Sequence, residues 1–427
     1  MRVQLDPPLG ASIRARLRAA ACVLLAVGVP TIARPDSSSP KYQLDTAALL
    51  YGEANRANVV EPTARITRLF DGGASLGFGF TLDVITGASP TGARPAGGIQ
   101  TITTPSGKTQ TVSAGQLPTT AFHDTRAAFD ADWVQPVGTL FSAQTGGSYS
   151  LEKDYESVGV SEKLSIETSH RLTTWSVGGG FNQDAVFPVG GTPVGLTSGG
   201  ELTGVTRNSK QLASGLIGVS QVLSRRWMVG VDVTRTVERG YLTEPYKIVS
   251  LLDPVTQDPV GHVTELRPAS RQRTDVLGSS VYHLDRDVVY VSYRYYWDDW
   301  HVRSNTLDFR YRNERENGSF LQPHVRLYTQ TAAEFFTLGL ENGAALPEFA
   351  TSDQRLSHFN SVTLGLTYGF KLPNYPGEFT VRGEYIGQFG PVNLNAGEAG
   401  DEGAPVTPDA FPPLNIGTLT AVYTLTF

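Results

Sequence analysis

The sequence predicts an all-β protein, a transmembrane antiparallel β-barrel of about sixteen strands, and three observations support this prediction. Stretches of about ten residues alternate between apolar and small or polar side chains. Every second connection between these stretches is short. After residue 33, no segment approaches the ~18 consecutive apolar residues of a membrane helix. A chain of this kind that enters a membrane must therefore cross it as a closed barrel.

The alternation is clearest in "ASLGFGFTLDVIT" (residues 74–86), where Phe78 and Phe80 lie on one face and Gly77 and Gly79 on the other. Glycines and charges opposite aromatic side chains favour a wet interior and a lipid-facing exterior over a soluble sandwich. The same pattern predicts strands at 42–53, 58–70, 74–86, 123–133, 139–151, 155–167, 172–182, 210–223, 227–238, 274–284, 288–297, 302–312, 319–329, 361–370, 379–387 and 416–427.

Long and short connections alternate along the chain. Long connections occupy 87–122, 183–209, 239–273, 330–360 and 388–415, and short ones such as "DGG" (71–73) and "SRR" (224–226) alternate with them. Outer-membrane barrels have short periplasmic turns and long extracellular loops, so we expect that orientation. The loops "GTPVGLTSGGELTG" and "NAGEAGDEGAPVTPDAFPP" have few apolar residues, and we expect them to be mobile. Whether they cover the mouth or stand away from it remains open.

The N-terminus predicts export. Arg14, Arg16 and Arg18 precede a short apolar run that ends in small residues, which is typical of a signal peptide over residues 1–33. The domain prediction is therefore a leader, 1–33, and one barrel, 34–427, in the outer membrane of a Gram-negative bacterium. The only cysteine, Cys22, lies in the leader, so the mature chain offers no thiol chemistry. A formal net charge of −6 does not provide the excess of positive charge that is typical of proteins that bind nucleic acid.

The C-terminus is a second compartment signal. Tyr423, Leu425 and Phe427 share one face of a final strand that ends on an aromatic residue. This resembles the C-terminal signal of bacterial outer-membrane barrels, which implies the barrel-assembly machinery as a partner. Outer-membrane lipid and lipopolysaccharide are the other expected partners, together with a possible periplasmic protein.

Three stretches resemble the outer-membrane barrel family known as domain of unknown function 3570. They are "DVITGASPTGA" (83–93), "LEKDYESVGV" (151–160) and "YRYYWDDWHVRSNTL" (293–307). The resemblance runs from about Tyr42 to Phe427 and implies a barrel in the outer membrane. It brings no catalytic residues and no substrate. In "DVITGASPTGA", Pro90 and the two glycines favour a tight turn, and an inward-folding constriction loop is the alternative.

No enzyme signature is present, so the chain is not expected to be an enzyme or to bind a cofactor or metal. HExxH, GxSxG in a strand–turn–helix context, the P-loop and CxxCH are all missing from the sequence. Some outer-membrane barrels carry a Ser–His pair, but neither His283 nor His324 has a convincing nucleophile nearby in the pattern.

Charged residues on the inward phase form the main candidate site. They alternate with outward aromatic residues on several strands near the C-terminus, and they are Arg294, Asp308, Arg310, Arg312, His324, Arg326, Arg382 and Glu384. One interpretation is a cross-strand ladder of opposite charges. The other is an electropositive wall that favours anionic solutes, since arginine binds carboxylate and phosphate bidentately.

The stretch "RYYWDDWHV" (294–302) falls in the outer-loop phase. Trp297 and Trp300 are expected to be interfacial girdle residues. Asp298 and Asp299 are expected at a hairpin tip, where they bond to backbone amides and face water. A site that bridges divalent ions or lipopolysaccharide is the alternative for these two carboxylates.

Barrels of sixteen to eighteen strands are wide enough for an aqueous channel. The favoured function is therefore a porin-like channel for small polar, possibly anionic, solutes. Two alternatives remain: a sheath that holds a periplasmic or surface partner such as a redox protein, and a structural barrel plugged by its own loops.

Overall fold

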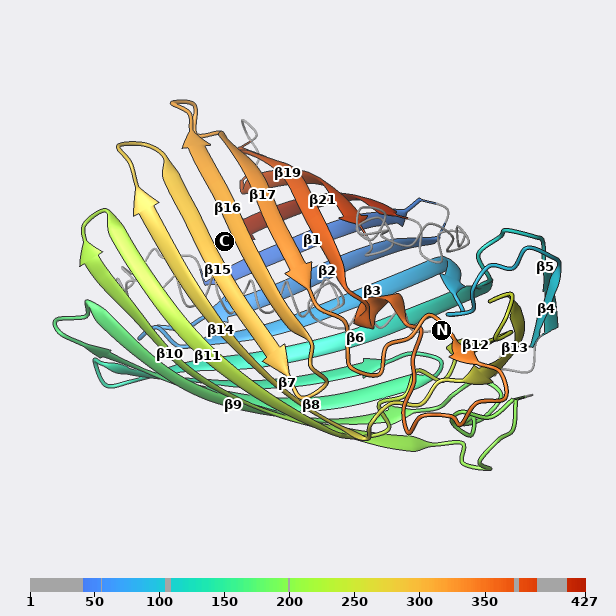
Figure 1. Cartoon of the computed structure of the whole chain (residues 1–427). Coiled ribbons are helices and arrows are strands. Elements are labelled where there is room, and N and C mark those ends of the chain that lie inside the picture. The colour runs from blue at the N-terminus through green and yellow to red at the C-terminus, as the bar shows by residue number, and fades with distance from the viewer. Residues whose placement is uncertain (1–40, 55, 104–108, 199, 372–375, 390–412) are drawn as a thin grey trace.

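The computed structural model describes residues 41–54, 56–103, 109–198, 200–371, 376–389 and 413–427. The predicted leader, 1–33, and most of the last long loop, 390–412, lie outside the described residues. Sixteen strands form one closed antiparallel barrel, in which β21 pairs with β1 to complete the ring. Figure 1 shows the tilted strands around the lumen and the loops gathered at one end.

The barrel strands follow chain order around the ring. Their bounds are β1 Tyr42–Glu53, β2 Ala57–Leu69, β3 Ser75–Pro90, β6 Thr119–Val137, β7 Phe141–Leu151, β8 Tyr155–Thr168, β9 Thr173–Val186, β10 Asn208–Ser224, β11 Trp227–Gly240, β14 Ser270–His283, β15 Val288–Asp298, β16 Arg303–Glu314, β17 Phe320–Gln330, β19 Phe359–Phe370, β20 Glu378–Phe389 and β21 Leu414–Thr426. All sixteen expected strands are present, and the predicted fold class is confirmed.

The two faces of the wall differ as the alternation requires. Phe78 and Leu364 each expose 54% of their surface on the outer face, whereas Gly77 and Gly79 on the inner face are buried. An apolar exterior of this kind indicates contact with lipid, because exposing so many apolar side chains to water would be unfavourable. Among the described residues, no helix is long and apolar enough to cross a bilayer.

The two ends of the barrel differ as the connection lengths predict. Within the described chain, the short-turn end carries connections such as 70–74 and 225–226, and the long-loop end carries 91–118, 187–207, 241–269 and 331–358. These four segments, in their described parts, are called the cap. They contain β4 Gln100–Thr103, β5 Thr109–Val112, β12 Ile248–Leu252, β13 Pro259–Thr264, β18 Leu340–Glu341 and the 3₁₀ helix η1 Gln354–Leu356.

The cap is a folded unit with its own core. β12 pairs with β13 and with β18, so 241–269 and 331–358 share one small sheet. Val249, Val263 and Ala350 are buried in a cluster against which Leu196 packs. The Ile248 amide also donates to the Thr91 carbonyl at 2.9 Å. Segments that leave the barrel at separate points of its rim therefore meet over the mouth (Figure 1).

Two expectations about the loops are corrected here. The segment "GTPVGLTSGGELTG", in its described residues, is bonded to β13, because the Leu196 amide donates to the Thr264 carbonyl and the Thr264 amide donates to the Thr197 carbonyl. Backbone hydrogen bonds hold this segment in place, although it has few apolar side chains to bury. In "DVITGASPTGA", β3 continues to Pro90, and Gly92 has φ +96° with the Ile248 carbonyl at the place of a Cβ. The segment packs into the cap, so the tight-turn prediction was wrong.

Candidate functional site

A cluster of charges lines one side of the lumen on β16 and β17. His324 Nε2 lies 2.8 Å from Asp308 Oδ2, and Arg326 Nε donates to the same oxygen at 2.8 Å. Arg310 Nε lies 3.1 Å from Asp308 Oδ1. Asp308 is paired with Arg326 in register, and Arg310 with His324, so one inward face presents all four. A single carboxylate thus holds two guanidinium groups and an imidazole.

The cluster continues across β19 to β20, although no side chain of β19 takes part. His324 Nδ1 lies 2.8 Å from Glu384 Oε1, and Arg382 Nη1 lies 3.9 Å from that oxygen. Gly365 stands between His324 and Glu384 in register, and a Cβ there would lie 3.0 Å from Glu384. The glycine therefore leaves the gap through which β17 reaches β20. Both ring nitrogens of His324 face carboxylate oxygens, and only the doubly protonated ring can donate to both.

The basic wall is the name used below for Asp308, Arg310, His324, Arg326, Arg382 and Glu384. It contains four cationic groups and two carboxylates. The side chains of Arg310, Arg326 and Arg382 keep 24%, 25% and 33% of their surface exposed, so part of each side chain faces the lumen.

Two other predicted members lie apart from this group. Arg294 Nε donates to Asp275 of β14 at 3.0 Å. Arg312, near the short-turn end, donates to Glu314 at 2.9 Å, and its guanidinium carbon lies 3.6 Å from the centre of the Phe320 ring. Each has its own local partner, so the eight predicted charges form one cluster and two separate pairs.

A second cluster, which sequence reasoning missed, lies on β2 and β6. Arg65 Nη1 donates to Asp130 at 2.6 Å, and its other terminal nitrogen contacts Asp132. The inward glycines of β3, Gly77 and Gly79, lie under these contacts, and a Cβ at Gly79 would be 2.6 Å from Asp130. The glycine alternation in "GFGF" was the available signal. It identified an inward face but not the charges of the two flanking strands.

The same side of the lumen carries further carboxylates toward the long-loop end. Asp83 and Asp124 point inward from β3 and β6, and both are buried. One oxygen each of Asp124, Glu152 and Asp154 lies within 4.8 Å of the others. Arg126 lies 3.3 Å from Glu152, and Tyr246 donates to Asp154 at 2.6 Å. The acidic wall is the name used below for Arg65, Asp83, Asp124, Asp130 and Asp132.

The hairpin "WDDW" differs from its predicted role at two positions. The Asp298 carboxylate has no exposed surface and accepts from Arg271 at 2.6 and 2.8 Å. It also accepts from the backbone amides of Trp300 and Val302 at 3.1 and 2.9 Å. The expectation that Asp298 faces water was wrong, because Arg271 neutralises it inside. With its charge balanced in this way, it offers little to a bridging cation.

Trp300 is also a buried residue and not a girdle residue. It is 4% exposed and packs with Tyr296, Val302, Ala333 and Leu356. Its Nε1 donates to the Ser270 carbonyl at 2.9 Å, and Arg271 covers its ring at 4.3 Å. The hairpin folds inward because the cap offers Trp300 an apolar core. Trp297 lies on the outer face against Tyr295, and Asp299 is exposed and accepts from the Gln272 amide at 2.8 Å.

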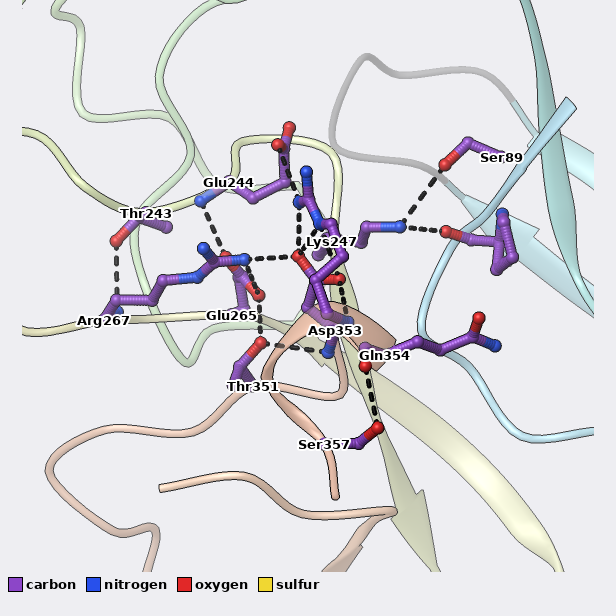
Figure 2. Close-up of polar contacts among 12 residues, drawn as sticks. Ser89, Thr243, Glu244, Lys247, Glu265, Arg267, Thr351, Asp353, Gln354 and Ser357 are labelled. Atoms are coloured by element: carbon purple, nitrogen blue, oxygen red, sulfur yellow. Dashed lines mark hydrogen bonds and ion pairs between the residues drawn. The ribbon is translucent and has the colours of Figure 1, made fainter. Parts of the chain in front are cut away.

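A buried ion network holds the cap together (Figure 2). Glu265 lies 2.7 Å from Arg267 Nε, and Arg267 Nη2 donates to Asp353 at 2.7 Å. Arg355 forks onto Asp353 through Nε at 2.8 Å and reaches Glu244 at 3.2 Å. Glu244 and Glu265 come from 241–269 and Asp353 from 331–358, so the network joins two cap segments. Sequence reasoning missed these residues because nothing periodic relates them.

Lys247 ties the network to the barrel rim. Its Nζ donates to the Pro90 carbonyl and lies 3.4 Å from Ser89 Oγ, at the end of β3 (Figure 2). β3 is the third strand of the ring and β11, which leads into the Lys247 segment, is the ninth. With sixteen strands in the ring, six positions separate these points, so the contact spans much of the mouth.

Burial and pairing act against each other in this network. Burial opposes ionisation of Asp353, but Arg355, Lys247 and Arg267 outweigh it and hold the pKa of that carboxyl well below its usual range. Burial raises the pKa of Glu265, which Arg267 partly offsets. Burial also lowers the pKa of Lys247, and Asp353 partly offsets this. Asp353 is therefore the anion on which the surrounding cations depend.

The predicted C-terminal signal lies in the strand that closes the ring. Phe427 stacks on Tyr42 of β1, with ring centres 5.7 Å apart. Tyr423 packs on Phe379 of β20 at 4.5 Å. The three signal residues are thus placed at the short-turn end, next to the seam between the first and last strands.

The chain belongs to the family described as "Protein of unknown function (DUF3570)", whose model matches residues 14–400. This confirms the suspected family. A comparison with curated protein sequences found no match.

Several solved structures align with most of this chain at low sequence identity. The outer membrane protein opdK from Pseudomonas aeruginosa aligns at TM-score 0.40 and 8% identity, over 90% of this chain and 98% of that one. OccK2 (OpdF) from the same organism aligns at TM-score 0.39 and 8% identity, over 91% and 98%. A bacterial polysaccharide outer membrane secretin aligns at TM-score 0.44 and 8% identity, over 92% and 100%.

Proposed function

We propose that this protein is a channel of the Gram-negative outer membrane that passes small polar solutes, with its long-loop end narrowed by the cap. The supporting observation is the pairing of an apolar exterior with an interior lined by ionised clusters. The basic wall has more cationic groups than carboxylates, and such an unbalanced cluster is favourable only where water can solvate it. In this orientation the short-turn end faces the periplasm and the cap faces the outside.

An anion preference was one sequence-based hypothesis, and it rests on the basic wall alone. The acidic wall brings two aspartates around Arg65 and further carboxylates above them. A lone anion near Arg326 would therefore also experience repulsion from the other side of the lumen. The proposal is accordingly a channel for small polar solutes without a preference for one sign of charge.

Conductance of the purified full chain in planar lipid bilayers tests this proposal. We expect discrete current steps, and larger steps for Asp353→Asn, because loss of that carboxylate loosens the cap. Asp285→Asn is a matched control, since Asp285 is an exposed residue of a short turn and pairs with Arg226, which is exposed as well. Steps of wild-type size are expected from this control.

The packed cap favours one second candidate, a structural barrel plugged by its own loops. Zero conductance from the folded wild type and from the cap-loosened variant would support the plug and contradict the channel. Zero conductance together with a protein that co-purifies would instead support the sheath alternative.

A further inference from the structure

The β16 and β17 part of the basic wall lies opposite the β6 part of the acidic wall. β6, which carries Asp130 and Asp132, is the fourth strand of the ring, and β16, which carries Arg310, is the twelfth. Eight of the sixteen positions separate them, which is half of the circumference. β17, with Arg326, adjoins β16, whereas β20, with Arg382, is the fifteenth strand and lies five positions from β6. The charges of β16 and β17 therefore face Asp130 and Asp132 across the lumen, and Arg382 lies to one side of this axis.

The walls also lie at similar depth. Arg310, His324 and Arg382 are four residues from the short-turn ends of their strands, and Arg326 and Glu384 are six. On the other side, Arg65 is four residues from that end, Asp132 is five and Asp130 is seven. A solute at this level of the lumen would have both walls beside it at once.

The balance of charge differs in sign between the walls. The basic wall has two cationic groups more than it has carboxylates, because Asp308 and Glu384 stand against three arginines and the doubly bonded His324. In the acidic wall at this depth, Arg65 stands against both Asp130 and Asp132. Low-dielectric walls concentrate such a field across a narrow aqueous space.

Internal pairing leaves part of each wall available. Asp130 keeps 30% of its side-chain surface exposed and Asp132 21%. On the basic side, Arg382 is the most exposed of the arginines at 33%, and its distance of 3.9 Å from Glu384 leaves its donors weakly occupied. A carboxylate suits these guanidinium groups, and an ammonium group suits the aspartates.

We propose that this transverse arrangement selects small zwitterions, solutes with an ammonium group and a carboxylate on one short skeleton. This inference rests on the proposed channel and names its substrate class. A lone anion or cation is attracted by one wall and repelled by the other, and a neutral solute gains little. A zwitterion that lies across the lumen is attracted at both ends.

Uptake into liposomes that contain the purified full chain tests the inference, with protein-free liposomes subtracted. The four probes have similar size: alanine as zwitterion, lactamide as neutral solute, lactate as anion and choline as cation. We expect alanine to enter roughly three- to tenfold faster than lactamide, because fields of this kind raise local solute concentration by about tenfold or more.

Two variants should move the preference in opposite directions. Asp130→Asn with Asp132→Asn removes the acidic side, and lactate should then enter faster than choline. Arg382→Gln weakens the basic side, and choline should gain relative to lactate. Arg382 is loosely paired, so this second variant preserves the test if the double variant fails to fold. Arg286→Gln, in an exposed turn beside Glu316, is the control and should leave every ratio unchanged.

The outcomes separate the two proposals. No uptake of any probe would overturn the channel itself. Uptake in which alanine and lactamide enter equally fast would overturn the zwitterion inference and leave the channel standing. A shift in the same direction for both variants would also contradict it, since opposed walls require opposite shifts.

Discussion

The barrel wall and the cap both gather arginines around carboxylates, yet they leave them in different surroundings. In the wall, Arg326 and Asp130 keep a quarter or more of their side-chain surface exposed. In the cap, Arg267 and Asp353 keep 4% and 2%. A buried charge must be paired with an opposite charge, because no water is present to solvate it. A lumen pair retains water and can be shared with a solute.

Asp353→Asn should produce the largest effect, because it leaves Arg267 and Arg355 buried without their main anion. We expect the cap to lose about 3–5 kcal/mol of stability while the barrel stays folded. Limited proteolysis should then cut within 241–269 and 331–358. Asp285→Asn should keep wild-type resistance. Equal resistance in both variants would remove the distinction between wall and cap.

Trp300→Ala should come next, at about 3 kcal/mol, because it opens a cavity in the cluster with Tyr296 and Leu356. Trp297→Ala is the matched change on the outer face and should cost less in the cap. Protease resistance of the cap measures both. If Trp297→Ala loosened the cap as much as Trp300→Ala, the inward placement of Trp300 would be contradicted.

Gly365→Ala tests the wall, where we expect a cost of about 1–3 kcal/mol from overpacking against Glu384 and His324. Gly383 on neighbouring β20 has open space around a would-be Cβ, so Gly383→Ala should be neutral or slightly stabilising. Urea unfolding of each variant in lipid vesicles gives the two free energies. If the two free energies of unfolding agree, the space left by the missing side chain at Gly365 has no structural role.

The smallest effect is expected from mild acid. A carboxyl with a depressed folded pKa contributes stability above its unfolded value, and loses it as pH falls through the folded value. For Asp353 that loss lies well below pH 3.8. The difference in cap proteolysis between the wild type and Asp353→Asn, measured with an acid-tolerant protease, should therefore be unchanged between pH 8 and pH 5. A difference between the two proteins that disappears near pH 5 would contradict the low pKa of Asp353.

Much of the wall follows from the sequence, because a strand that separates lipid from water must alternate at every second residue. This alternation places Asp308, His324 and Glu384 on the inward face. Register across Gly365 decides which of them touch, and alternation does not encode it. Arg65 was missed because its partners lie on β6, two strands further along the ring.

The cap has no comparable pattern. Glu265 and Asp353 are 88 residues apart in the sequence and come together only through the β12–β18 pairing and its neighbours. The hairpin sequence alone favours a girdle position for Trp300, because the apolar core that buries it is formed by the distant segment 331–358. Loops without periodicity take their structure from contacts between residues that are distant in the sequence. A local sequence pattern does not predict these contacts.

The inward glycines have a consequence for how relatives of this chain would vary. His324 and Glu384 are bonded although β19 runs between their strands, and Arg65 reaches Asp130 over β3 in the same way. Selection on these pairs would correlate positions in strands that are second neighbours. Strand order inferred from such correlations alone would omit one strand at each glycine and describe a barrel of smaller circumference than the real one.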